Sequence, residues 1–154
     1  MKVLIPGSFD PPTFGHLDVI HRSINTFNEV LIGVISNPSK DPMFDGETRK
    51  LMIEENIELS STIEIKVFEG LLVDFARENN IEAIVKGVRA MTDFDYEFQM
   101  AQVNKELDGL ETLFVPAKPE YGYVSSSLVK EIFRLGGDVA SFVPSSVLER
   151  LNNE

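Results

Sequence analysis

The chain has 154 residues, with 14 lysines and arginines against 25 aspartates and glutamates, which is a formal net charge of −11. This length suits one domain with its own core, so we expect a single domain over residues 1–154. The charge argues against a general nucleic-acid binder, which needs a broad basic surface. Cysteine is absent and only His16 and His21 are present, which excludes disulfides and thiolate zinc sites and argues against a histidine metal cage. Neither a membrane span nor a signal peptide is visible, so we expect a cytoplasmic protein.

Short apolar runs alternate with helical patterns along the chain. In chain order, the pattern of the first half predicts a strand at Val3–Ile5, a helix carrying Leu17, Ile20, Ile24 and Phe27, and a strand at Val30–Ile35. A helix follows that Asp45 could cap, with Glu47 in its first turn and Arg49–Leu59 after it. The remainder predicts strands at Ile63–Phe68, Ala83–Val85 and Thr112–Val115, and helices at Leu71–Asn79, Asp93–Leu107, Ser126–Leu135 and Ser145–Leu151.

These alternating elements predict an α/β fold. Most strands lack strict polar alternation, which is typical of strands that are covered on both faces in a parallel sheet. We therefore expect an open five-stranded parallel sheet with helices on both faces. The helix Asp93–Leu107 carries two apolar stripes, which indicate either a wide core face or a subunit interface. Ligands of such folds bind where loops leave the carboxyl ends of the strands.

The loop after the first strand, Pro6–His16, contains the first candidate site. Gly7 leaves room for close approach of a ligand to the backbone, and Ser8 offers a hydroxyl donor beyond it. Gly15 and His16 come at the entrance to a helix, where free N–H groups favour an anion. Neither a Walker A loop nor a GxGxxG fingerprint is present.

Further loops place phosphate-binding groups at the same expected edge. Lys40 follows the second strand, and Lys86 and Arg89 flank Gly87 after the fourth. The three serines Ser125–Ser127 open a helix, where they serve either as caps or as phosphate ligands. This concentration of cations and hydroxyls in an acidic chain predicts a polyphosphate ligand such as a nucleotide.

Several of these strings match one enzyme family. Thr13-Phe14-Gly15-His16 matches the T/H-x-G-H motif of the nucleotidyltransferase superfamily, and Ser125–Lys130 is similar to its second motif. The strings PGSFDP, SNPSKDPMF, KGVRA, DFDYEFQMA and SSSLVKE, in this order, closely resemble bacterial phosphopantetheine adenylyltransferases. The resemblance runs from about residue 3 to the end. It implies a Rossmann-like nucleotidyltransferase fold, and transfer of the adenylyl group of ATP to 4′-phosphopantetheine, with Mg²⁺ entering with ATP and no protein metal ligand.

The resemblance also implies roles for individual residues and a homohexamer. His16, Lys40 and Arg89 are the expected catalytic residues, with His16 stabilising the transition state. The residues expected at ATP are Ser8, Phe9, His16, Gly87, Val88, Arg89, Glu97, Tyr121, Gly122, Tyr123, Val124, Ser125, Ser126 and Ser127. Those expected at phosphopantetheine are Ser8, Lys40, Leu72, Lys86 and Asn104. Asp10 and Asp93 match the family too, and we expect them to be structural.

This sequence departs from the family pattern at two notable positions. Lys86 stands where relatives usually have arginine, and a lysine holds a phosphate as a single mobile charge rather than with a planar fork. Ile5 stands where relatives often have tyrosine. Both changes bear on the affinity of the site for the acceptor. Two alternatives stay open: an adenylyltransferase of the same superfamily with another phosphate acceptor, because the histidine motif is shared, and a nucleotide-sensing module without turnover.

Overall fold

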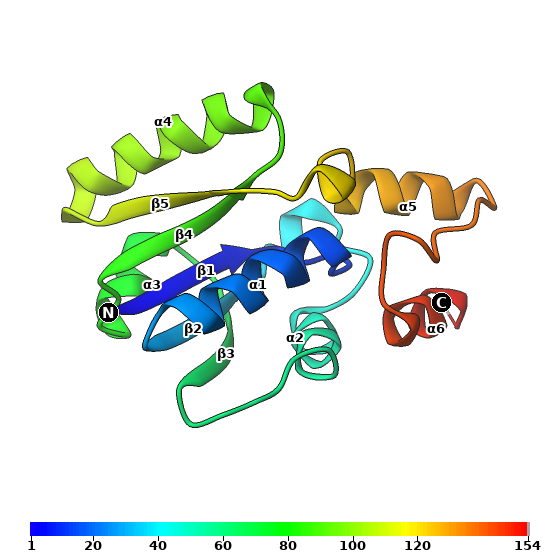
Figure 1. Cartoon of the computed structure of the whole chain (residues 1–154), viewed down its shortest axis with the longest axis horizontal. Coiled ribbons are helices and arrows are strands. Elements are labelled where there is room, and N and C mark those ends of the chain that lie inside the picture. The colour runs from blue at the N-terminus through cyan, green and yellow to red at the C-terminus, as the bar shows by residue number, and fades with distance from the viewer. Residues whose placement is uncertain (154) are drawn as a thin grey trace.

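The computed structural model describes residues 1–153, apart from the side chains of residues 38 and 92. Its centre is one parallel sheet of five strands in the order β3-β2-β1-β4-β5 (Figure 1). The strands are β1 Lys2–Gly7, β2 Glu29–Ile35, β3 Ile63–Phe68, β4 Ala83–Val88 and β5 Glu111–Pro116. All five predicted strands are confirmed. The order reverses at β1, which pairs with β2 on one side and β4 on the other, so the carboxyl ends of β1 and β4 form a topological switch point.

Helices cover both faces of the sheet, as expected. Residues of α1 (Phe14–Thr26) and α2 (Gly46–Glu54) share a buried cluster with Val3 and Val30. Their neighbours Leu4 and Leu31 point to the other face, because successive strand side chains alternate, and they pack with α3 (Leu72–Glu78). The next helix, α4 (Met91–Asp108), contacts α3, β4 and β5.

Two further helices lie beyond the carboxyl ends of the strands (Figure 1). These are α5 (Ser126–Arg134) and α6 (Ser145–Asn152), and two short 3₁₀ helices, η1 (Pro38–Lys40) and η2 (Pro119–Tyr121), lie in the loops. A second buried cluster joins α5 and α6 to Phe44 and Met52, so α2 connects the sheet to the C-terminal helices. Within residues 1–153, no helix is both long and apolar enough to cross a membrane.

The predicted helix Arg49–Leu59 is wrong at its C-terminal end, because α2 stops at Glu54. Asn56 ends it: its side-chain amide donates to the Met52 carbonyl at 2.7 Å and to Ser146 Oγ at 2.8 Å. An asparagine that satisfies a last-turn carbonyl and also bonds a distant helix favours termination over continuation. This long-range bond could not be seen in the local pattern.

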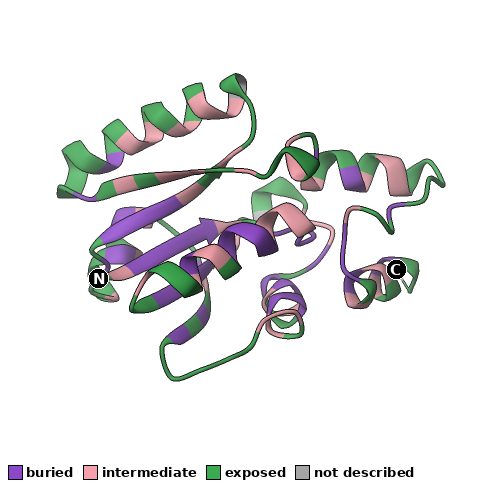
Figure 2. Ribbon diagram, in the orientation of Figure 1, coloured by how far each residue is buried: buried purple, intermediate pink, exposed green. Residues whose placement is uncertain are grey.

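One of the two apolar stripes of α4 does not form a core face within this chain, whereas Phe94 of the other packs on Phe114 of β5. Tyr96, Val103 and Leu107 are 63%, 47% and 53% exposed, and Figure 2 shows much of α4 as exposed or intermediate. The wide-core interpretation of this helix is therefore wrong for the single chain. A row of large apolar side chains left in solvent is typical of a surface that another molecule covers.

Candidate active site

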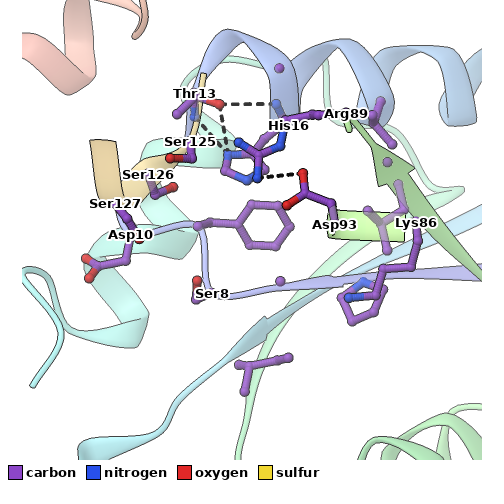
Figure 3. Close-up of a pocket in the computed structure, with 18 of the residues that line it drawn as sticks. Ser8, Asp10, Thr13, His16, Lys86, Arg89, Asp93, Ser125, Ser126 and Ser127 are labelled. Carbon is purple, nitrogen blue, oxygen red and sulfur yellow. Dashed lines mark hydrogen bonds and ion pairs between the residues drawn. The ribbon is translucent and has the colours of Figure 1, made fainter. Parts of the chain in front are cut away.

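A cavity of about 790 Å³ opens at the carboxyl ends of β1 and β4, where the strand order reverses. It is lined by the loops after β1, β2 and β4, by the first turns of α1 and α5, and by α4. Many of the residues expected at a nucleotide site line it: Ser8, Phe9, His16, Lys40, Lys86, Gly87, Arg89, Glu97, Val124, Ser125, Ser126 and Ser127. Figure 3 shows how several of these side chains point toward one another.

Other predicted site residues lie outside the lining of this cavity, namely Leu72, Val88, Asn104, Tyr121, Gly122 and Tyr123. Leu72, the first residue of α3, is partly buried against the hydrophobic cluster between α3 and the sheet. Asn104 is buried and follows Glu97 by seven residues, which places it about 10 Å farther along α4. Tyr121 stacks on Phe14 with ring centroids 6.2 Å apart, so it supports the first turn of α1.

His16 is held in one orientation by the residue that caps its helix. The Thr13 backbone N–H donates to His16 Nδ1 at 3.0 Å, while Thr13 Oγ1 accepts from the His16 backbone N–H at 3.4 Å. This is a capping box with histidine at the third helical position. Because Nδ1 accepts a hydrogen bond, the proton of the neutral imidazole is on Nε2. The capping box therefore leaves Nε2–H as a donor.

The imidazole is neutral at physiological pH. Burial, together with the positive charges of Arg89 and Lys86, lowers the pKa of His16 from 6.5 to about 4. The ring of Phe9 covers the imidazole edge to face, with centroids 5.1 Å apart. The ring also leaves no room for a side chain at position 7, since a Cβ at Gly7 would lie 2.9 Å from Phe9 Cζ. Gly7 lines the cavity, and close approach of a ligand to its backbone stays a prediction.

Two helix N-termini meet at the cavity. Gly15 and His16 in the first turn of α1 line it, and so do Ser126 and Ser127 in the first turn of α5. The free N–H groups and partial positive charge of a helix N-terminus favour anions. Two such ends at one cavity, with several cations, make a strong site for a polyphosphate.

The three serines of the α5 turn have different roles. Ser125 caps the helix, because its Oγ accepts from the Leu128 N–H at 3.1 Å. Ser126 Oγ donates to the Pro11 carbonyl at 2.8 Å and ties the turn to the loop after β1. Ser127 is exposed and lines the cavity. Ser125 and Ser126 thus hold the turn together, and Ser127 has a hydroxyl available to a ligand. Binding of a phosphate by Ser125 and Ser126 stays a prediction.

Three cations of the cavity already contact carboxylates. Lys86 Nζ lies 3.3 Å from Glu97, and Arg89 Nη2 lies 2.9 Å from Asp93. Lys130 Nζ lies 2.9 Å from Asp10. A phosphate that enters must compete with these carboxylates, so the pairs hold the cations in place before substrate arrives.

Asp10 is a structural carboxylate, as expected. It is buried, and besides Lys130 it accepts hydrogen bonds from the backbone N–H groups of Met43 and Phe44, both at 2.9 Å. It thereby joins the loop after β1 to the segment after Lys40 and to α5. Asp93, in the first turn of α4, is less buried and pairs with Arg89 in the loop just before that helix.

Comparison with known proteins identifies the family. A family model described as cytidylyltransferase-like matches residues 4–132. A phosphopantetheine adenylyltransferase of Caldanaerobacter subterraneus subsp. tengcongensis is 48% identical over 98% of this chain and 96% of its own length. One from Streptomyces coelicolor is 49% identical over 97% of this chain and 94% of its own. The chain belongs to the phosphopantetheine adenylyltransferase family.

Solved structures of lower identity support the fold alone. A bifunctional NMN adenylyltransferase/ADP ribose pyrophosphatase from Francisella tularensis superposes with a TM-score of 0.71 at 19% identity. That match covers 92% of this chain but only 44% of the other, so the chain spans less than half of that protein. A second structure of the same bifunctional protein is complexed with AMP and a manganese ion, with a TM-score of 0.69.

One prominent residue of the site was missed by sequence analysis. Arg49 lines the cavity and is 1% exposed. The signal was present, because Arg49 lies three and four residues before the buried Met52 and Ile53, on one face of α2. A charged residue in an amphipathic helix is normally assigned to the solvent face, so this position was not singled out.

Proposed function

We propose that this chain transfers the adenylyl group of ATP to 4′-phosphopantetheine, giving dephospho-coenzyme A and pyrophosphate. The observation that carries the proposal is the neutral, capped His16 at a cavity lined by cations and helix N-termini, in a chain about half identical to phosphopantetheine adenylyltransferases. A cytoplasmic location, where ATP is abundant, and a single domain belong to the same proposal.

The reaction needs positioning and charge stabilisation more than acid–base chemistry. A phosphate oxygen of the acceptor attacks the α-phosphorus in line, and the bond to the bridging oxygen breaks as pyrophosphate leaves with the electron pair. The attacking oxygen is already anionic, so no base is required. A neutral imidazole with its proton on Nε2 suits this step, because it donates to an α-phosphate oxygen as negative charge grows there.

Other residues divide between the two substrates in this proposal. Ser8, Phe9 and the α5 turn hold ATP together with Gly87 near the end of β4, Arg89 just after that strand and Glu97 on α4, while Lys40 and Lys86 hold the acceptor phosphate. Lys40 is exposed on η1 and lies between the two anions, where it offsets their repulsion. Leu72 and Asn104 are proposed on the path of the pantetheine arm, beyond the lining of the cavity.

Magnesium fits this site as an ion delivered with ATP. In residues 1–153, no group of three or more histidine, aspartate and glutamate side chains is arranged to hold a metal. The cavity carboxylates Asp10, Asp93 and Glu97 are engaged by cations instead. Triphosphate oxygens and water are the usual ligands of Mg²⁺ in such sites, and the ion would neutralise phosphate charge.

Pyrophosphate release from MgATP with 4′-phosphopantetheine tests the activity, with nicotinate mononucleotide and glycerol 3-phosphate as control acceptors. We expect dephospho-coenzyme A, identified by mass spectrometry, only with the first acceptor. Product with another acceptor would contradict the proposal that 4′-phosphopantetheine is the acceptor. It would indicate that Ile5 and Lys86 belong to a changed acceptor pocket. ATP binding without product from any acceptor would favour the sensing module.

The proposal includes a homohexamer, which the exposed apolar side of α4 supports. Sedimentation measures the assembly. Leu107→Glu, at a side chain that is 53% exposed on α4, should weaken the assembly, because it places a charge in the proposed interface. Leu59→Glu is the matched control, since Leu59 is 58% exposed but lies away from α4. A wild-type monomer, or equal effects of both variants, would contradict this part of the proposal.

A further inference from the structure

Arg49 is buried at the wall of the cavity, and among the described residues its side chain bonds only to backbone carbonyls. Its Nε donates to the carbonyls of Phe44 at 2.9 Å and Asp45 at 3.2 Å. Its Nη1 donates to the carbonyls of Ile35, at 2.9 Å, and Ser8. Within residues 1–153, no carboxylate lies within ion-pair distance of this guanidinium, and burial lowers the pKa of Arg49 although the charges of Asp10 and Asp45 oppose that shift. A buried charge costs free energy, and here the hydrogen bonds to backbone carbonyls must offset that cost.

The bond to the Ser8 carbonyl determines the orientation of the next peptide group. Phe9 has a φ of 50°, in the left-handed region that non-glycine residues rarely adopt. Arg49 holds the carbonyl of the peptide that joins Ser8 to Phe9, and in a trans peptide the N–H points the opposite way. The Phe9 N–H donates to no acceptor in the described part of the chain. Arg49 therefore stabilises a strained turn whose Phe9 N–H, in a residue that lines the cavity, has no acceptor in the described part of the chain.

The remaining bonds of Arg49 hold the segment that carries Lys40. Ile35 ends β2 immediately before this segment, and Phe44 and Asp45 follow it at the start of α2. The base of α2 is itself fixed against the sheet, because a Cβ on Gly46 would lie only 2.6 Å from Val67 Cγ1. One rigid guanidinium thus joins both ends of the Lys40 segment to the Ser8 turn.

We propose that Arg49 is a positioning residue for adenylyl transfer, which aligns the Ser8–Phe9 turn with the Lys40 segment. This inference rests on the proposed function. By its bonds, Arg49 couples the loop proposed to hold ATP to the loop proposed to hold the acceptor. In-line attack depends on the relative placement of the two anions, and a displacement of about 1 Å can cost about 100-fold in rate. A lysine has the charge but not the planar fork of donors that reaches carbonyls in different directions.

The kinetic test compares Arg49→Lys with wild type and with Met52→Ala. Met52 is fully buried on the same helix but packs in the C-terminal cluster, so its truncation is a control for loss of stability. We expect Arg49→Lys to lower kcat about tenfold or more, with both KM values within about threefold, since the binding groups remain but their alignment is lost. Met52→Ala should leave kcat within about twofold at a temperature where it is folded.

Hydrogen–deuterium exchange tests the same idea without turnover. MgATP should protect residues 8–10 in wild type and in Met52→Ala, and this protection should be weaker in Arg49→Lys. Exchange without ligand should rise in Arg49→Lys at residues 8–10 and 36–45. If Arg49→Lys does not fold, Arg49→Met takes its place, because an apolar side chain of similar length removes the buried charge.

The outcomes separate this proposal from the proposed function. Normal kcat in Arg49→Lys, or exchange changes that match those of Met52→Ala, would overturn the role of Arg49. If wild type forms no dephospho-coenzyme A, the proposed function fails. The exchange experiment with MgATP then still decides whether Arg49 positions the turn.

Discussion

Protonation of His16 should make the folded chain sensitive to mild acid. The pKa of His16 is about 4 in the folded state and 6.5 when the ring is in water. Between these values the unfolded chain binds a proton that the folded chain does not. Stability is therefore lost as the pH falls from about 6.5 to about 4, and below 4 both states are protonated, so the loss stops growing.

The magnitude follows from the same two values. A difference of about 2.5 pH units, at 1.36 kcal/mol per unit, corresponds to about 3 kcal/mol of unfolding free energy. This is a substantial share of the roughly 5–15 kcal/mol that stabilises a typical domain.

Urea unfolding at pH 7 and pH 4 measures the effect in wild type and in His16→Asn. Asparagine does not titrate, and its side-chain oxygen accepts the Thr13 N–H that His16 Nδ1 accepts. Wild type should lose about 3 kcal/mol more than His16→Asn over this range, while carboxylates affect both proteins equally. Equal losses would show that His16 is not held neutral by its surroundings, and would remove the basis for a neutral donor.

Three further predictions concern single residues. His16→Ala should lower kcat about 10²–10³-fold with little change in ATP affinity, as for loss of an oxyanion donor; near-normal turnover would refute the assignment. Lys86→Arg should lower the KM for the acceptor in steady-state assays, because a fork replaces a point charge; an unchanged or higher value would show a site tuned to lysine. Asp10→Asn should cost about 3 kcal/mol in urea unfolding, because it leaves Lys130 unpaired, whereas exposed Asp74→Asn should cost under about 1 kcal/mol; equal costs would refute the structural role.

The strands and the location of the site could be predicted from local patterns. Runs such as Val30–Ile35 are apolar without alternation, which requires cover on both faces and so a parallel sheet. Once the sheet is parallel, all carboxyl ends lie at one edge. Lys40, Lys86 and Ser127 therefore had to meet there, although they are far apart in the chain.

The tautomer and charge of His16 depended on more than its motif. A histidine three residues after a threonine at a helix start allows a capping box, but the lowered pKa comes from burial beside Phe9 and from two cations on β4 and its loop. Likewise, Asn56 ended α2 early through a bond to a residue 90 positions away. The pKa of His16 and the end of α2 thus depend on contacts between distant elements, which cannot be predicted from a local sequence pattern.

By itself, the sequence determined the α/β class, the motif loops and the resemblance that led to the family, because periodicity and short motifs are local properties. Only the tertiary structure decided which polar groups are paired. It placed Asp10 on Lys130, left α4 with apolar side chains in solvent, and buried Arg49 among four carbonyls. The physical reason is that burial and hydrogen bonding of a charge depend on what the folded chain brings against it, and this is a property of the packing of all elements together.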